Sequence, residues 1–149
     1  MPEFKSLSAL ESYLQEKVNA ALSNQVAEVV KEVEAQNAEA QVYDVYQPTT
    51  YNRRYSLSNP ENIEATVKNG TLELCYDVDF NSGYGTKNSG PDLAGLVEHG
   101  DGWNGYRYDY PGGVYSGARP FIRTTKLQVQ TEGAELLKYA LIENGLNVE

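Results

Sequence analysis

Two runs of alternating apolar and polar residues flank the dipeptide Asn69-Gly70, and this arrangement constrains the fold more than any other part of the chain. The runs cover residues 63–67 and 72–80. Alternation places every second side chain on the same face of a strand. Asn-Gly favours the tight turn between two antiparallel strands, because both of its residues accept positive φ. The sequence therefore predicts a β-hairpin.

One face of this hairpin is expected to be apolar and the other polar. The apolar face carries Ile63, Ala65, Val67, Leu72, Leu74, Tyr76, Val78 and Phe80. The polar face carries Glu64, Thr66, Glu73, Asp77 and Asp79. A single hairpin cannot bury its own apolar face, so helices from elsewhere in the chain are expected to cover it.

Before the hairpin, apolar residues recur every three or four positions. They are Leu10, Leu14, Val18, Leu22, Val26, Val29, Val30 and Val33. The spacing predicts one amphipathic helix over residues 8–38, about 45 Å long. Ser8 and Glu11 match a capping box at its start. Such a helix overhangs a domain of this size, so either part of its stripe meets another subunit or it bends after Asn24.

Three further elements complete the predicted secondary structure. Residues 120–145 read as a helix that begins at Pro120, ends at Gly145 and has a possible bend at Gly133. Residues 93–99 predict a short helix that Gly100 would stop. The β-branched and aromatic residues at 42–46 predict a short strand.

Together these elements predict an α+β fold in a single domain over residues 1–149. An antiparallel sheet built on a central hairpin is expected to be packed by a long N-terminal helix and a C-terminal helix. The expected segments are the long helix at 8–38, strands and hairpin at 42–80, Gly- and Tyr-rich loops with a short helix at 81–119, and the C-terminal helix at 120–145.

Charge and composition exclude several function classes. The chain has 21 acidic and 12 basic residues and a net charge of −9, so it has no basic field with which to hold nucleic acid through its phosphates. No run of about 20 apolar residues is present, so we expect no membrane span. Cys75 is the only cysteine, so no internal disulfide can form. Its place in a strand pattern predicts a small buried thiol.

The residues give no argument for catalysis, and we expect neither a cofactor nor a metal. His99 is the only histidine, and its neighbour Glu98 would point in a different direction on a helix. Asp77 and Asp79 share a strand face and would allow a metal-dependent enzyme together with His99, which is a third hypothesis. The sequence contains no phosphate-binding loop, nucleophile elbow or zinc-binding helix motif.

Two aromatic segments are candidates for recognition. Residues 100–121 hold the only Trp, four tyrosines and six glycines, and residues 49–57 combine tyrosines with paired arginines. So many glycines do not support a helix, whereas amphipathic rings are frequent in contact surfaces. For residues 100–121, the alternative is a loop whose tyrosines pack back onto the core. For residues 49–57, the alternative is that Arg53 and Arg54 pair with nearby acids.

The residues that we expect to form protein contacts have large side chains with a polar or charged tip. They are Tyr51, Arg53, Arg54, Trp103, Tyr106, Tyr108, Tyr110 and Arg119.

Residues 43–54, 93–100 and 118–122 resemble the neck, or tail-completion, proteins of long-tailed bacteriophages. The similarity runs over most of residues 10–146. The resemblance implies an α+β subunit without catalytic residues, which assembles at the junction between the capsid portal and the tail. The protein would then reside in the virion after assembly in the host cytoplasm.

The resemblance also implies partners. The subunit would form a ring, expected to be a hexamer, next to a head-closure or connector protein and a tail terminator or tail-tube protein. DNA would pass through without sequence-specific binding and without contact with a membrane, and an acidic wall suits this role because it does not hold phosphates. The alternative is a small carbohydrate- or peptide-binding module with Trp103 and the tyrosines as a stacking platform.

Overall fold

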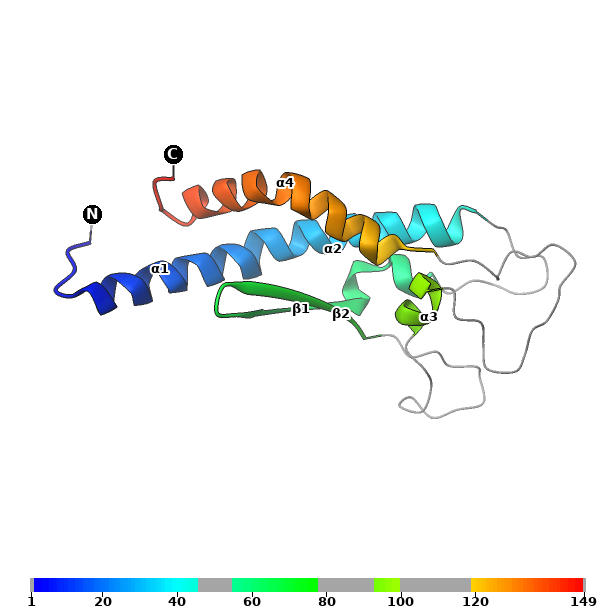
Figure 1. Cartoon of the computed structure of the whole chain (residues 1–149), viewed down its shortest axis with the longest axis horizontal. Coiled ribbons are helices and arrows are strands. Elements are labelled where there is room, and N and C mark those ends of the chain that lie inside the picture. The colour runs from blue at the N-terminus through cyan, green and yellow to red at the C-terminus, as the bar shows by residue number, and fades with distance from the viewer. Residues whose placement is uncertain (1, 46–54, 78–92, 100–118, 149) are drawn as a thin grey trace, which may run out of the picture.

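The structure, a computed structural model, describes residues 2–45, 55–77, 93–99 and 119–148. Figure 1 shows an elongated body in which a long N-terminal helical rod lies between a β-hairpin and the C-terminal helix. This mixed helical and antiparallel architecture confirms the predicted fold class.

The N-terminal rod consists of four consecutive helical segments. They are α1 (Leu7–Ala21), the π-helical turn η1 (Leu22–Val26), α2 (Ala27–Ala38) and the π-helical turn η2 (Glu39–Tyr43). The predicted long helix is confirmed and continues beyond its expected end. At Asn24, where the sequence allowed a bend, the structure has η1, and π-helical turns are a usual cause of helix bending.

The predicted N-cap at Ser8 is wrong. The Oγ atom of Ser6 accepts a hydrogen bond from the amide of Ala9 at 3.2 Å, and α1 begins at Leu7. The amide of Leu10 also bonds to the carbonyl of Ser6 at 3.3 Å, so Ser8 already lies inside the first turn. Ser6 and Ala9 have the same three-residue spacing as the capping box, and the helix uses the earlier serine.

The predicted strand at residues 42–46 is also wrong. Val42 and Tyr43 belong to η2, and Asp44 and Val45 form a turn, whereas Tyr46 lies outside the described residues. Val42 and Tyr43 are both buried. Adjacent residues of a strand point to opposite faces, so burial of both on one side favours the helix over the local β propensity.

The hairpin forms as predicted from β1 (Ile63–Lys68) and β2 (Thr71–Tyr76), paired antiparallel. Asn69 and Gly70 have φ angles of 50° and 74°, as a turn with two positive φ values requires. The amide of Gly70 donates to Oδ1 of Asn19 at 3.0 Å, which ties the hairpin turn to α1. The predicted apolar residues Val78 and Phe80 lie outside the described residues.

Cys75 is exposed, so the prediction of a buried thiol is wrong. Leu74 and Tyr76 are half-buried on the inner face of β2, and Cys75 alternates with them. The strand period of two therefore turns its side chain outward.

Both predicted downstream helices are present: α3 (Leu93–His99) and α4 (Phe121–Glu143). Pro120 immediately precedes α4, and the helix runs unbroken through Gly133. Gly145 has a φ of +85°, and the amide of Leu146 bonds to the carbonyl of Leu141 at 3.0 Å. This geometry confirms Gly145 as the helix stop.

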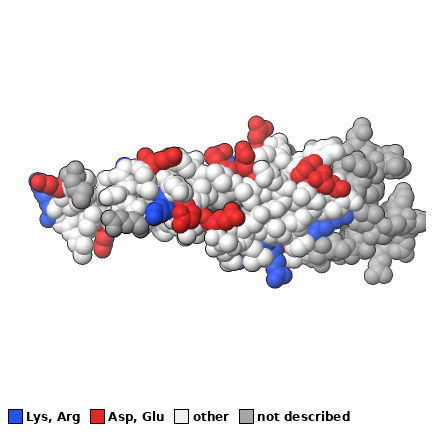
Figure 2. All heavy atoms as spheres, turned by 90° about the horizontal axis from the view of Figure 1, so that it is seen from above, with Lys and Arg blue, Asp and Glu red and all other residues white. Residues whose placement is uncertain are grey.

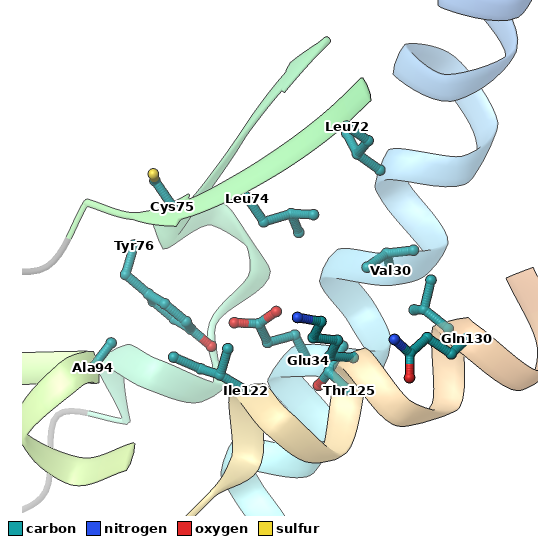
Figure 3. A pocket seen from close by; sticks show the side chains of 12 residues that line it. Val30, Glu34, Leu72, Leu74, Cys75, Tyr76, Ala94, Ile122, Thr125 and Gln130 are labelled. Atoms are coloured by element: carbon teal, nitrogen blue, oxygen red, sulfur yellow. The ribbon is translucent and has the colours of Figure 1, made fainter. Parts of the chain in front are cut away.

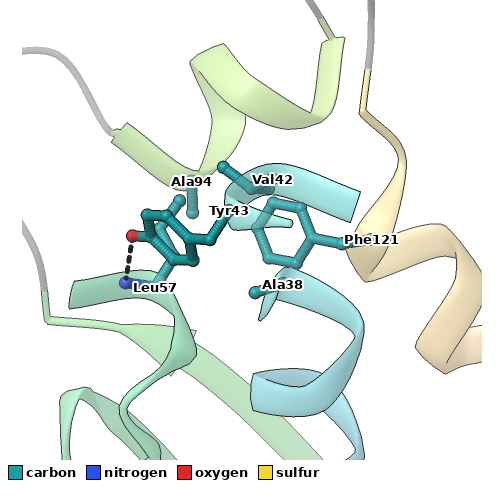
Figure 4. Packing of buried hydrophobic residues seen from close by; sticks show 6 residues of the cluster. All are labelled: Ala38, Val42, Tyr43, Leu57, Ala94 and Phe121. Atoms are coloured by element: carbon teal, nitrogen blue, oxygen red, sulfur yellow. Dashed lines mark hydrogen bonds between the residues drawn. The ribbon is translucent and has the colours of Figure 1, made fainter. Parts of the chain in front are cut away.

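Two groups of buried side chains hold the body together. The hairpin cluster joins the rod to α4 and to the inner face of the hairpin, and its buried members are Ala21, Leu22, Val26, Val30 and Ala140. The anchor cluster joins α2 and η2 to α3 and the start of α4, and its buried members are Ala38, Val42, Tyr43, Leu57, Ala94 and Phe121. Figure 4 shows the second cluster around the ring of Phe121.

Candidate functional site

The elements of the body converge at the end opposite the hairpin turn, which we call the anchor end (Figure 1). The C-terminal ends of η2 and β2, helix α3 and the start of α4 all lie there. These elements bound the three undescribed segments, 46–54, 78–92 and 100–118. Chain positions that are far apart in the sequence therefore enter and leave the body at one end.

Seven of the eight predicted contact residues lie in the undescribed segments. They are Tyr51, Arg53 and Arg54 in the first segment and Trp103, Tyr106, Tyr108 and Tyr110 in the third. Both segments are bounded by residues of the anchor end. The assignment of these side chains to a protein interface stays a prediction.

Arg119 is the predicted contact residue that the structure describes. Its Nη1 atom donates to the carbonyl of Val42 at 3.2 Å, and its amide donates to the carbonyl of Val97 at 3.0 Å. The side chain is half-buried. A cation at the carboxyl end of a helix also interacts favourably with the helix dipole. Arg119 thus joins the end of the rod to α3 and α4, whatever further contacts it makes.

Two tyrosine hydroxyls hold the backbone of Leu57. The amide of Leu57 donates to Oη of Tyr43 at 3.0 Å, and Oη of Tyr76 donates to the carbonyl of Leu57 at 2.9 Å. Leu57 lies in η3 (Ser56–Ser58), directly after the first undescribed segment and Tyr55. The amide and the carbonyl of Leu57 therefore both have a hydrogen-bond partner.

Glu98 caps the start of α4 from a different helix. Its Oε2 accepts from the amide of Ile122 at 2.9 Å, and its Oε1 accepts from the amide of Arg123 at 3.0 Å. The first amides of a helix have no partner inside the helix, and a carboxylate there also interacts well with the dipole. Sequence reasoning missed this role because Glu98 and Ile122 are too far apart for any local capping pattern.

Glu34 on α2 is a buried carboxylic acid with a shifted pKa. Its side chain is 6% exposed, and burial raises its pKa from 4.5 to about 7, with a further contribution from the negative charge of Glu98. The pKa of Tyr76 is also raised, mainly by burial and to a smaller extent by the charges of Glu34 and Tyr43. Sequence reasoning assigned Glu34 no role, since a lone glutamate beside an apolar stripe gives no signal of burial.

Glu34 lies in a groove of about 670 Å³ between β2, α2 and α4 (Figure 3). Its carboxyl group points into the groove, near the hydroxyl of Tyr76. The walls are mainly apolar and include Leu72, Leu74 and Val129.

The residues of the metal hypothesis are placed only in part. His99 and Asp77 are exposed, and Asp79 lies outside the described residues. Within residues 2–45, 55–77, 93–99 and 119–148, no three His, Cys, Asp or Glu side chains gather closely enough to bind a metal ion. In the same part of the chain, no helix has the length and apolar character of a membrane span.

Acidic side chains are spread over the face of the molecule that Figure 2 shows. Figure 2 shows acidic side chains along the length of one face, with basic side chains between them. The face presents no continuous basic patch among the described residues, so it offers no surface of the kind that holds phosphates.

Of three comparisons with known proteins, the one with family models found a match. A search of curated proteins and a search of solved structures each found no match. The family model YomN matches residues 6–144, which include every described helix and both strands. The chain therefore belongs to the YomN family, which is associated with bacteriophages.

Proposed function

We propose that the protein is a structural subunit of the phage head–tail junction. It forms a ring with copies of itself, docks a head-closure or connector protein on one side and a tail terminator or tail-tube protein on the other, and lets DNA pass. Family membership supports the link to phages. The resemblance of residues 43–54, 93–100 and 118–122 to neck proteins supports the position at the junction.

The observation that carries the proposal is that the described residues that bound segments 46–54 and 100–118 lie together at the anchor end. The segment with Tyr51, Arg53 and Arg54 and the segment with Trp103 both start and finish there. Tyr and Arg are enriched among residues that dominate protein interfaces. An end to which both segments are attached is a suitable docking surface for a neighbouring chain.

The anchor end is also built to hold the stems of these segments in place. Tyr43 and Tyr76 form hydrogen bonds with the backbone of Leu57, and Glu98 accepts hydrogen bonds from the first amides of α4. Arg119 donates to the carbonyl of Val42. A preorganised frame lowers the entropy that association must overcome. The acidic surface supports a role in DNA passage, because it does not hold phosphates.

The test is to replace Trp103 and follow assembly. Trp103→Ala should leave the subunit folded, as shown by unchanged circular dichroism and melting temperature, but reduce ring formation with the tail components. Tyr139→Ala is the matched control, because Tyr139 is 65% exposed and lies in the C-terminal part of α4, whereas the anchor end holds the start of that helix. Native mass spectrometry and negative-stain microscopy measure the assemblies.

Two results would count against the proposal. The first is a wild-type protein that remains a 16.5 kDa monomer after mixing with purified portal, connector and tail-tube proteins of the same phage. The second is a Trp103→Ala variant that forms complete rings as readily as the wild type. A monomer that binds glycans would instead favour a carbohydrate-binding module.

A further inference from the structure

The groove at Glu34 combines apolar walls with one deeply placed acid. Leu72 and Leu74 of β2 and Val129 of α4 line its sides, and Val30 and Glu34 come from α2 between them. The remaining lining residues close to Glu34 are Tyr76, Ala94, Ile122 and Thr125. Such a site can hold a group that is apolar along its length and polar at its tip.

Glu34 has no partner in this groove. Among the described residues it makes no hydrogen bond and no ion pair, although Lys126 lines the same groove. The Tyr76 hydroxyl is nearby, but it donates its proton to the carbonyl of Leu57 at 2.9 Å. Every fully buried side-chain oxygen of the described residues has a hydrogen-bond partner. The carboxyl oxygens of Glu34 have none, so they are not fully buried and remain accessible in the groove.

The charges around Glu34 are unbalanced. Glu98 of α3 adds a second negative charge, and both of its oxygens are occupied by the amides of Ile122 and Arg123. Tyr76 of β2 also lines the groove, whereas the thiol of Cys75 on the same strand points away from it (Figure 3). Lys126 of α4 is the only cation among the described lining residues. A buried carboxylate without a paired cation is costly, so the site favours an incoming positive charge.

We propose that this groove receives a lysine or arginine side chain of a partner protein, with the methylene stem between the apolar walls and the cation at Glu34. Lysine and arginine carry an apolar stem and a charged end, which matches the arrangement of the groove. The inference rests on the proposed function only because a partner chain supplies the side chain.

Binding of a cation at this site is linked to the protonation of Glu34. An opposite charge within about 4–6 Å of a carboxyl group lowers its pKa by about 1–3. For each unit by which the pKa of Glu34 falls, the cation binds the ionised site about tenfold more tightly than the protonated site. Affinity should therefore rise as pH increases through about 7, the pKa of Glu34 in the free protein.

The test uses n-butylguanidinium as the probe and n-butylurea as its neutral analogue of the same shape. Protein labelled with ¹³C at the glutamate carboxyl groups is titrated with each probe at pH 6 and pH 8, and the Glu34 signal is assigned with Glu34→Gln. We expect the pKa of Glu34 to fall by at least about one pH unit with the cation and to stay unchanged with the urea. Binding of the cation should be about tenfold stronger at pH 8.

Variants separate this site from the general acidity of the surface. Glu34→Gln should abolish the pH-dependent binding, whereas Glu32→Gln, which removes an exposed acid of the same helix, should retain it. Equal responses to both probes would overturn the proposal. A Glu34 that titrates near 4.5 in the free protein would overturn it as well, because it would indicate that a cation of this chain already occupies the groove.

The result can be read independently of the proposed function. A protein that forms rings but does not bind n-butylguanidinium contradicts the groove proposal and leaves the ring intact. A protein that binds the probe but remains monomeric with its phage partners contradicts the ring and leaves the cation site intact.

Discussion

The two hydrophobic clusters stabilise the same body in different ways. The buried members of the hairpin cluster are all alanine, leucine or valine, so their packing is apolar and carries no preferred hydrogen-bond direction. The anchor cluster contains Tyr43 and packs against Tyr76, and the hydroxyls of both bond to the backbone of Leu57. Glu98 and Arg119 add further bonds at the helix ends beside it.

This difference indicates that the two clusters have different structural roles. The hairpin cluster supplies most of its stability through buried area, and such packing tolerates changes that preserve volume. The anchor cluster also specifies direction, because each hydrogen bond is lost if the backbone of Leu57 or the start of α4 shifts. Directional bonds are found at the end where the predicted contact segments join the body.

The largest expected effect comes from removing the centre of the anchor cluster. Phe121 is fully buried, and Phe121→Ala should destabilise the fold by about 3–5 kcal/mol. Leu22→Ala in the hairpin cluster should cost about 2–5 kcal/mol. Urea unfolding measures both. When the two variants are compared under conditions that give equal free energies of unfolding, hydrogen exchange at the amides of Leu57 and Ile122 should be faster in Phe121→Ala than in Leu22→Ala. Equal exchange rates would contradict the different roles of the two clusters.

The next largest effect is the pH dependence that Glu34 creates beside the anchor cluster. Its pKa is raised from 4.5 to about 7 in the folded protein, so the folded state holds this proton more tightly. The associated stability is fully present below pH 4.5 and is lost as pH rises through about 7. The total is about 3 kcal/mol at 1.36 kcal/mol per pKa unit.

Glu34→Gln tests this expectation, because it keeps the shape of the side chain and removes the titration. Urea unfolding at several pH values between 4.5 and 8 should show a smaller decline for the variant than for the wild type. Glu32→Gln, an exposed change on the same helix, should follow the wild-type profile. Identical profiles for wild type and Glu34→Gln would exclude Glu34 as the source of the decline.

A smaller effect is expected from a single hydroxyl of the anchor cluster. Tyr43→Phe leaves the amide of Leu57 buried without its partner, which should cost about 1–3 kcal/mol. Tyr139→Phe is the control, since Tyr139 is 65% exposed, and should change stability by less than about 0.5 kcal/mol. Thermal and urea unfolding report the difference, and similar values for the two variants would argue against a structural role for the hydroxyl.

The smallest expected effect is that of the cap on α4. Glu98→Gln retains an oxygen acceptor but loses the charge at the helix start, at a cost of about 1 kcal/mol. It also removes the negative charge that raises the pKa of Glu34, so that pKa should fall. NMR titration of Glu34 checks the second effect, and an unchanged pKa would mean that burial alone sets its value.

Features that depend on neighbouring residues were predictable from the sequence. Asn69-Gly70 with alternating flanks predicted the hairpin, and the turn has the two positive φ angles that those residues permit. The apolar stripe predicted the long helix, and Gly145 predicted the end of α4. In each case, the feature depends on a periodicity or a backbone angle that a few consecutive residues determine.

Two of the wrong predictions have different causes: packing overrode a local propensity at Val42 and Tyr43, and the strand alternation was not applied to Cys75. Val42 and Tyr43 have high β propensity, but both side chains are buried in the anchor cluster, and a helical end achieves this. Cys75 lies in an apolar run, but the alternation of β2 turns it outward. Local propensity spans only about 1 kcal/mol for a strand residue, which burial of large side chains exceeds.

The candidate site divides in the same way. Aromatic and basic composition pointed to residues such as Tyr51 and Trp103 as contact residues, and that part stays a prediction. The groove with Glu34 and the cap by Glu98 had no sequence signal, since each depends on residues from different elements.

The sequence by itself determined the elements of this protein, namely the long rod, the hairpin and the two later helices, because helix and strand periods are local properties. The tertiary structure alone decided which elements meet at the anchor end, which tyrosine hydroxyls bond to the backbone of Leu57 and which glutamate is buried. Burial and charge interactions depend on distances between segments, and those distances exist only after the elements have packed.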